Sequence, residues 1–209
     1  LSTDTMGSQS TAVGYGALNT QNFSTATASH NTAVGNLAGV SVTTGQQNTL
    51  VGSLAGDALN TGENNTAFGV SALGTDTKGD LSVAIGHSAL SSQNFSTNAN
   101  SYNTAVGASA GLSVTTGIYN TLIGGLAGDA LTDADLNVAV GQGALTTDTK
   151  GSQSVAVGYG ALSTQNFTTS TNSLNTAVGY EAGVAITTGN QNTLIGGKAG
   201  DALTEGNSN

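Results

Sequence analysis

The chain has 209 residues, including 31 Gly, and it contains no Pro, Cys or Trp. Only 7% of its residues are charged, and three Lys, no Arg and twelve acids give a net charge of -9. This composition excludes disulfides and thiolate metal sites, and it provides no basic stripe for nucleic acid. Since no apolar run approaches the about 18 residues of a membrane span, we expect no membrane insertion by this segment.

An internal repeat runs through the whole chain, marked by a Gly that follows Val, Ile or Phe. These ruler glycines are Gly14, Gly35, Gly52, Gly69, Gly86, Gly107, Gly124, Gly141, Gly158, Gly179 and Gly196. The steps between them are 21, 17, 17 and 17 and then start again, so four short units form a super-repeat that spans 72 positions. We therefore predict one continuous array over residues 1–209, with super-repeats 1–72, 73–144 and an incomplete 145–209. The unfinished super-repeat and the start at Leu1 lead us to expect a piece of a longer protein.

Each unit contains a short strand whose two faces are both apolar. In the copy that starts at Asn31, Thr32 and Val34 share one face and Ala33 takes the other, because side chains alternate along a strand. The period of two and the frequent Gly exclude a helix. We expect Thr32 and Val34 to point into the core and Ala33 to face a neighbouring chain, as in strands that are buried on both sides.

So short a unit has no core of its own and must stack on its neighbours. We therefore predict an all-β fold, a parallel β-solenoid (β-roll) of about eleven coils of 17 and 21 residues, with essentially no helix. The second apolar face needs a cover, which favours a side-by-side homo-oligomer. A monomer in which small Ala side chains lie in water is the alternative.

A column of Asn and Ser lies four residues before each ruler Gly. Its members are Ser10, Asn31, Asn48, Asn65, Ser82, Asn103, Asn120, Asn137, Ser154, Asn175 and Asn192. Identical polar side chains at stacked turns can form a hydrogen-bonded ladder. Because the position recurs on every unit, we interpret it as structural rather than as a catalytic or ligand-binding residue.

The 21-residue units carry a recurring insertion with the sequence Gln-Asn-Phe-Ser/Thr, which predicts a loop on one side of the solenoid. We expect its Phe to pack over the coil, the alternative being an exposed contact. Each copy is also an Asn-x-Ser/Thr sequon, so the candidate glycosylation sites are Asn22, Asn94 and Asn166. In a chain so rich in Asn and Thr, chance is the competing explanation.

The titratable residues do not follow a catalytic or metal-binding pattern. His30 and His87 do not recur across the super-repeat, and Asp133 and Asp135 form an isolated Asp-x-Asp, whereas Ca²⁺ needs several oxygen ligands. We predict no metal, no cofactor and no enzymatic activity.

Two versions of the repeat resemble known repeat families. The copies Ser82–Gly86 and Ser154–Gly158, each with an Ala three residues later, resemble the head repeats of trimeric autotransporter adhesins. The copy Asn175–Tyr180 resembles repeats of phage tail fibres. The resemblance implies a left-handed β-roll with three chains side by side, outside the cell or on a virion. The units here are longer than those of the adhesins, and general chirality rules favour right-handed crossovers, so handedness depends on the resemblance alone.

These observations favour a non-enzymatic structural fibre or adhesin segment, such as a surface adhesin or a phage tail-fibre shaft. Its expected partners are other copies of itself, with a trimer favoured, and an unknown host receptor, glycan or matrix. The alternatives are a ligand-binding solenoid with a glycan- or ice-binding face, and the shaft of a hydrolytic tailspike. Val83, Val138 and Val155 interrupt the Thr column, which indicates an inward face rather than one that binds ice.

Overall fold

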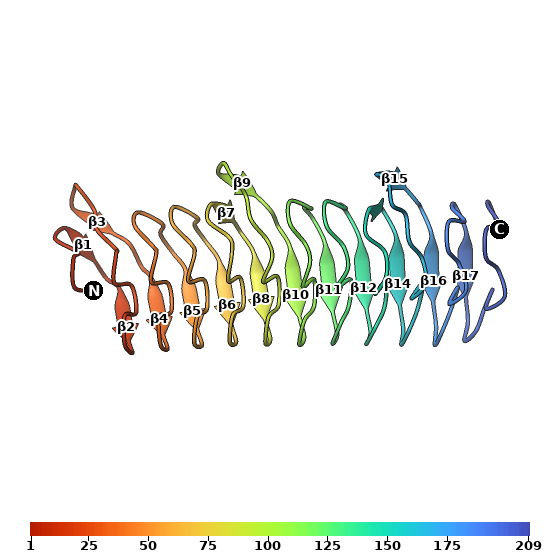
Figure 1. Cartoon of the computed structure of the whole chain (residues 1–209), viewed down its shortest axis with the longest axis horizontal. Helices are drawn as coiled ribbons and strands as arrows, with labels where there is room; N and C mark the ends of the chain where they lie inside the picture. The colour runs from red at the N-terminus through yellow and green to blue at the C-terminus, as the bar shows by residue number, and fades with distance from the viewer.

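Eleven strands of three residues each stack in parallel along the long axis of the molecule, one strand per coil (Figure 1). The computed structural model describes residues 1–209 and contains no helix, so the predicted β-solenoid of eleven coils is confirmed. The stacked strands are β2 (Thr11–Val13), β4 (Thr32–Val34), β5 (Thr49–Val51), β6 (Thr66–Phe68), β8 (Val83–Ile85), β10 (Thr104–Val106), β11 (Thr121–Ile123), β12 (Val138–Val140), β14 (Val155–Val157), β16 (Thr176–Val178) and β17 (Thr193–Ile195).

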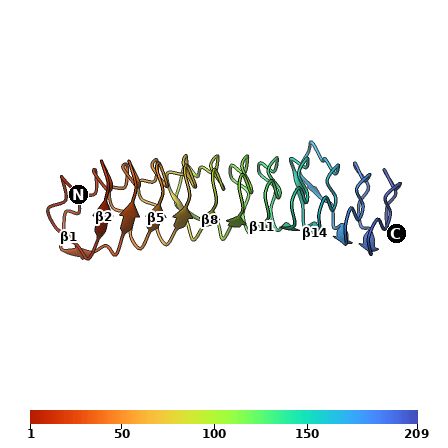
Figure 2. The same cartoon turned by 90° about the horizontal axis from the view of Figure 1, so that it is seen from below.

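Six shorter strands form three pairs, each with one strand from a 21-residue unit and one from the coil before it. They pair as β1 (Gly7–Ser8) with β3 (Thr27–Ala28), β7 (Gly79–Asp80) with β9 (Ala99–Asn100), and β13 (Gly151–Ser152) with β15 (Thr171–Asn172). Each pair holds an inserted loop against the coil before it. The loops stand out above the row of coils in Figure 1, and Figure 2 shows the same row from below, with the two termini at opposite ends. No helix of the length and hydropathy needed to cross a membrane is present.

The register of the main sheet follows the ruler glycines. Ala33 pairs with Leu50 and Ala105 with Leu122, in each case one short unit further along the chain, so equivalent positions lie directly above one another. The spacing in the sequence therefore sets the register, and each coil repeats the environment of the previous one.

The two faces of each strand are the reverse of those we expected. Ala33 and Leu50 are completely buried, whereas Thr32 is half-buried and Val34 is 36% exposed. The interior of a coil is narrow, because the opposite wall also contributes side chains, and only Ala or a single Leu fits between the walls. The Thr and Val columns therefore face outward, and the expectation that they fill the core was wrong.

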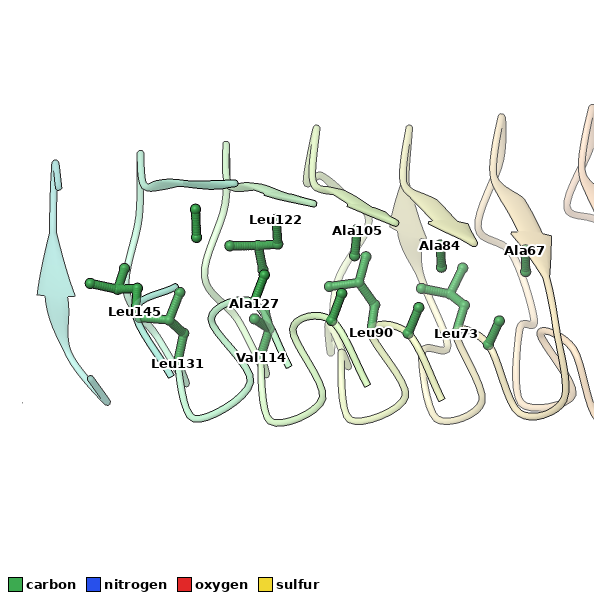
Figure 3. Packing of buried hydrophobic residues seen from close by; sticks show 14 of the residues in the cluster. Ala67, Leu73, Ala84, Leu90, Ala105, Val114, Leu122, Ala127, Leu131 and Leu145 are labelled. Atoms are coloured by element: carbon green, nitrogen blue, oxygen red, sulfur yellow. The ribbon is translucent and has the colours of Figure 1, made fainter. Parts of the chain in front are cut away.

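The core is a continuous row of apolar side chains, mostly Ala and Leu with Val42, Val114 and Ile186 between them, and Figure 3 shows the middle of this row. Where the strand supplies Ala, as at Ala67 and Ala84, Leu73 and Leu90 project from the opposite wall. Where the strand supplies Leu122, the opposite wall has Gly, and a Cβ on Gly128 would lie 2.7 Å from Leu122 Cδ2. In these two kinds of coil one Leu thus occupies the core from either wall. A third kind, with Ala33 opposite Gly39, has no Leu at either place, and its space is taken by Leu50 and Leu18 of the adjacent coils, whose side chains would lie 2.7 and 3.1 Å from a Cβ on Gly39.

The ruler Gly is required where coils approach most closely. Gly35 has a φ of 144°, and a Cβ there would lie 2.4 Å from the carbonyl oxygen of Gly52 in the next coil. Other corners carry larger residues at positive φ, including Leu37 and Gln47, both at 58°. This conformation costs about 1–2 kcal/mol per residue, and the backbone N–H groups of Leu37 and Gln47 each donate a 2.8 Å hydrogen bond to the preceding coil that offsets it.

Candidate interaction face

One side of the solenoid carries no charged residue. We call it the strand face: the segment from five residues before to one residue after each ruler Gly, on all eleven coils. None of the three Lys and twelve acids falls in this segment, so all of them lie elsewhere on the coils. The charge of -9 is therefore confined to the rest of the surface.

The strand face exposes large apolar and aromatic side chains. They include Val13, Tyr15, Val34, Phe68, Val70, Ile85, Tyr102, Tyr119, Ile123, Leu136, Tyr159, Leu174, Tyr180 and Ile195. Phe68, in the middle of a strand column, is 55% exposed. Such residues are enriched in the contact regions of protein interfaces, whereas charged residues are depleted there.

Stacked tyrosines lie along both borders of this face. Tyr102 and Tyr119, five residues before their ruler Gly, have ring centroids 5.4 Å apart and planes inclined by 10°. Tyr159 and Tyr180, one residue after theirs, have the same geometry. The coil repeat brings both pairs together, because equivalent positions lie on adjacent coils. Each pair forms a preformed aromatic surface whose rings remain about half exposed.

The size of the face matches a protein interface. Eleven coils at about 4.8 Å span roughly 50 Å, and a width of about five residues at 3.3 Å gives roughly 800 Å². That is about one partner's share of a standard interface.

Hydrogen bonds link the Asn column from coil to coil. The Asn48 side chain donates from Nδ2 to the carbonyl oxygen of Gly62 at 2.9 Å and accepts at Oδ1 from the backbone N–H of Asn65 at 3.0 Å. Most bonds therefore run from side chain to the backbone of the next coil rather than between side chains. The ladder changes at Ser82, whose hydroxyl instead lies 2.6 Å from that of Ser101. The Asn side chains are buried, so they support the coil and are not available to a ligand.

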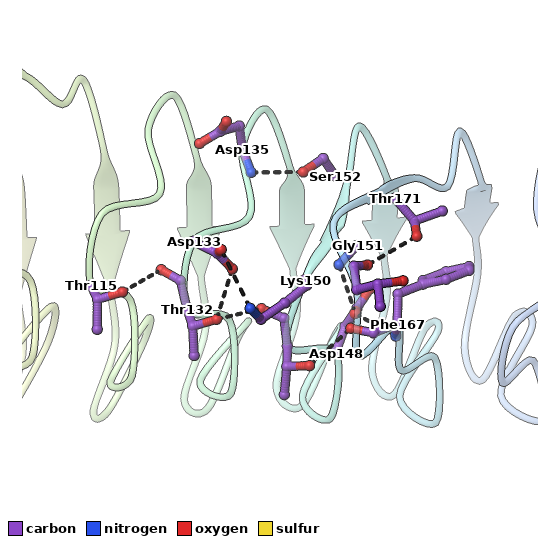
Figure 4. Close-up of polar contacts among 12 residues, drawn as sticks. Thr115, Thr132, Asp133, Asp135, Asp148, Lys150, Gly151, Ser152, Phe167 and Thr171 are labelled. Carbon is purple, nitrogen blue, oxygen red and sulfur yellow. Dashed lines mark hydrogen bonds and ion pairs between the residues drawn. The ribbon is translucent and has the colours of Figure 1, made fainter.

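The inserted loop closes over a buried carboxylate that the sequence reasoning missed. Asp76 is completely buried and accepts hydrogen bonds from the N–H of Gly79 at 2.9 Å and from Gln93 Nε2 at 2.6 Å. Phe95 is buried as expected, with its ring over Gly79. Figure 4 shows the third copy, in which Asp148 receives the N–H groups of Gly151 and Phe167.

The available signal for this carboxylate was the Thr-Asp-Thr that recurs once in each super-repeat, always one short unit before the Gln of the insertion. In the first copy, burial alone would raise the pKa of Asp4, but hydrogen bonds from Gln21 and from backbone N–H groups outweigh it and lower the pKa. The recurring Asp therefore pins each inserted loop to the coil below it.

The three sequon asparagines lie on the outer side of the inserted loops. Asn22, Asn94 and Asn166 are exposed, and each accepts a hydrogen bond of 3.1 Å from the hydroxyl of a Thr. Their side chains are thus accessible from solvent.

The other titratable side chains do not converge. His30 and His87 are exposed on different coils. Asp133 pairs with Lys150 at 3.5 Å (Figure 4). The carboxylate of Asp135 instead accepts the N–H of Ile118 at 2.8 Å, so the two acids have separate partners. No group of three or more His, Asp and Glu residues is placed to hold a metal ion.

Comparisons of the chain with models of protein families, with curated proteins and with solved structures find no significant match. We therefore infer a function from the strand face itself.

Proposed function

We propose that this chain is a non-enzymatic structural segment of an extracellular fibre, of the adhesin or tail-fibre kind, whose copies associate side by side through the strand face. The observation that carries the proposal is the absence of charge from this face on all eleven coils, together with its exposed Val, Ile, Phe and Tyr side chains. Such a segment is a stiff repetitive spacer on a cell surface or virion, and it presents its charged side outward for attachment.

The distribution of charge supports association by this face. The acidic remainder of each surface repels its equivalent on another copy, whereas the uncharged face carries no such penalty. Contact here also removes Val34 and Phe68 from water, which is favourable by about 25 cal/mol per Å² of apolar area. From the sequence we expected the column of Ala33 to contact the neighbouring chain. Because the structure buries Ala33 and exposes Val34, the proposed contact between chains is made by the column of Val34 instead.

The two borders of the face are suited to a closed ring of chains, and we propose three. One border carries Tyr102, Tyr119 and Leu136, and the other carries Tyr159 and Tyr180. In a rotationally symmetric assembly about the long axis, one border of each chain meets the other border of the next, and the ring closes without free apolar surface. Three chains also agree with the resemblance to trimeric repeat families.

The test is the mass of the native chain and of two matched variants, measured by light scattering over a range of concentrations. We expect a trimer for the native chain and for Thr116→Lys, because Thr116 is exposed outside the strand face. Ile123→Lys places a charge in the middle of the face, and we expect it to be monomeric, because burial of an unpaired charge is costly. A monomeric native chain at every concentration would refute the proposal.

A second function gains support from the same face. The Thr column faces outward, contrary to our expectation, and Thr occupies it on eight of the eleven coils. A flat outward array of Thr and Val is the surface that ice binding requires, although Phe68 and the tyrosines project from it. Inhibition of ice recrystallisation by the native chain, lost in Ile123→Lys, would favour this function over assembly.

A further inference from the structure

A hollow of about 350 Å³ lies at the corner of the coils, beside the strand face. Its floor contains Gly143 and Gly160, each two residues after a ruler Gly. A Cβ added to Gly143 would meet nothing within 4 Å, so the floor is open to solvent. The coils on either side carry Leu126 and Glu181 at the same position, and these side chains contribute to the lining.

The hollow follows from the way the core is filled. Coils with a Leu pointing inward four residues after the ruler Gly, such as Leu145 and Leu162, have Gly or Ser two residues after it. Coils with Gly at the inner position have a larger residue, such as Leu126, at the outer one, except the coil with Ser109 and Gly111. Two coils of the first type are adjacent where super-repeats meet, and so the outer surface is depressed there.

The preceding super-repeat contains a related hollow of about 340 Å³. Its lining includes Leu54, Ser71 and Ser88, which lie one super-repeat before Leu126, Gly143 and Gly160. No aromatic side chain lines this copy. The two hollows share a position in the fold and differ in chemistry.

The lining of the first hollow combines an aromatic ring with fixed polar groups. Tyr159 is 53% exposed, and its ring is held by stacking on Tyr180. Glu181 contributes a carboxylate whose cationic neighbour is Lys198 at 3.7 Å. The amide of Gln142 and the hydroxyls of Thr146 and Ser163 complete the polar lining.

We propose that this hollow binds a neutral carbohydrate unit. A sugar ring has an apolar C–H face that can stack on Tyr159, and its edge carries hydroxyls that can bond to Glu181 and Gln142. A volume of 350 Å³ is at the lower end of the range for small-ligand sites, about 300–1,000 Å³. The net charge of -9 disfavours anionic sugars. This binding goes beyond the proposed fibre role and does not require association of chains.

The test uses saturation-transfer NMR with neutral oligosaccharides of glucose, galactose, mannose and N-acetylglucosamine as probes, and with sialyllactose as the anionic comparison. We expect transfer to at least one neutral probe and none to sialyllactose. Two variants address the site. Gly143→Leu fills the hollow and should fold, because Leu126 adopts a φ of 59° at the same position of the preceding coil. Tyr159→His introduces the residue found at the same place one super-repeat earlier, His87.

Each variant is expected to bind the responding probe at least about tenfold more weakly, the loss of one central contact. Ser71→Leu fills the related hollow that has no aromatic ring and should bind as the native chain does. Absence of transfer to every neutral probe, transfer to sialyllactose alone, or unchanged binding by both site variants would overturn the proposal.

Ile123→Lys separates this inference from the proposed function, because it removes assembly and leaves the hollow intact. Sugar binding by this monomeric variant supports the carbohydrate site. Because Tyr159 also lies on a border of the strand face, the monomeric Ile123→Lys chain is the decisive sample, and a lack of binding to every neutral probe by this variant refutes the carbohydrate site. A native chain that is monomeric yet binds sugar refutes only the fibre assembly.

Discussion

The side-chain oxygen of Asn120 accepts a hydrogen bond of 3.0 Å from the backbone N–H of Asn137, the residue at the same position one coil later. Its Nδ2 donates to the carbonyl oxygen of Ala134 at 2.8 Å. One buried side chain therefore satisfies two backbone groups of the following coil. Asp lacks the donor that Ala134 needs, which explains why Asn is the residue that propagates this pattern.

Replacement of this side chain is expected to be costly. Asn120→Ala leaves the N–H of Asn137 and the carbonyl of Ala134 without partners, at about 1–3 kcal/mol each. We expect the free energy of unfolding, from urea titration followed by circular dichroism, to fall by about 2–4 kcal/mol. Asn36→Ala is the control, since Asn36 is exposed, and it should change stability by less than about 0.5 kcal/mol. Equal midpoints for the two variants would contradict the ladder's role.

The buried Asp148 provides a second prediction. Its Oδ1 accepts the N–H groups of Gly151 and Phe167, and its Oδ2 accepts Gln165 Nε2. In Asp148→Asn, the amide NH₂ replaces one of these two oxygens and therefore faces an N–H donor in either orientation of the side chain. We expect the free energy of unfolding to fall by about 1–3 kcal/mol. Amide hydrogen exchange should accelerate at Gly151 and Phe167.

Asp201→Asn is the matched control for this substitution, since Asp201 is exposed. It should leave both the exchange rates and the stability unchanged. Unaltered exchange at Phe167 in Asp148→Asn would show that the carboxylate does not hold the inserted loop.

Two glycines with nearly the same backbone conformation should respond differently to Ala. Gly39 and Gly143 have φ of 57° and 65°. A Cβ on Gly39 would lie 2.7 Å from Leu50 Cδ1, whereas one on Gly143 would be in open space. Both changes incur a backbone cost of about 1 kcal/mol, and overpacking adds about 1–3 kcal/mol for Gly39→Ala alone. The thermal midpoint of Gly39→Ala should therefore be clearly the lower, and equal midpoints would refute the assigned core packing.

Stability should also depend on pH through a pair of partly buried acids. Burial raises the pKa of Glu63 above 4.5 and that of Asp80 above 3.8, and the charge of Asp80 raises the pKa of Glu63 further. An acid whose pKa is higher in the folded state binds more protons there than in the unfolded state. Its contribution to stability therefore increases as the pH falls through the raised pKa toward the ordinary value, and it is least favourable at neutral pH.

Asp80→Asn tests this dependence. Asn keeps an oxygen that can accept the Glu63 N–H, a bond of 2.7 Å in the native chain, and it removes the charge. We expect a higher thermal midpoint at about pH 7 than for the native chain and a smaller gain on acidification to about pH 4. Glu205→Gln, at an exposed position, is the control. A lower midpoint at neutral pH would show that the charge stabilises the fold.

The strands and their register could be predicted from sequence because spacing alone determines them. The direction of the strand faces could not be predicted from Thr32, Ala33 and Val34, since all three are compatible with burial. The deciding signal lay elsewhere in the coil. Leu50 occurs in a unit with Gly56 on the opposite wall, and a Cβ on Gly56 would lie 2.8 Å from Leu50 Cδ2. This exchange of volume identifies the Ala and Leu column as the inner one.

The parts of the site that were missed depend on contacts between coils. Asp76 belongs to a short polar segment that is typical of a surface turn, and it becomes buried only because the inserted loop carrying Gln93 and Phe95 folds over it. The hollow around Gly143 and Gly160 likewise exists only when two consecutive units are placed side by side. The residue pattern within one unit is enough to predict a coil. The buried Asp76 and the hollow, in contrast, form only where neighbouring coils are stacked on one another.

The strands lie across the long axis, so the hydrogen bonds between coils run along it. Tension applied to the two ends therefore peels coils away one at a time rather than shearing the whole sheet. A folded coil occupies about 4.8 Å along the axis, and the same short unit spans roughly 55–60 Å once it is released and fully extended. A single chain thus yields in small steps under load, and the side-by-side contact proposed for the strand face would distribute tension over several chains.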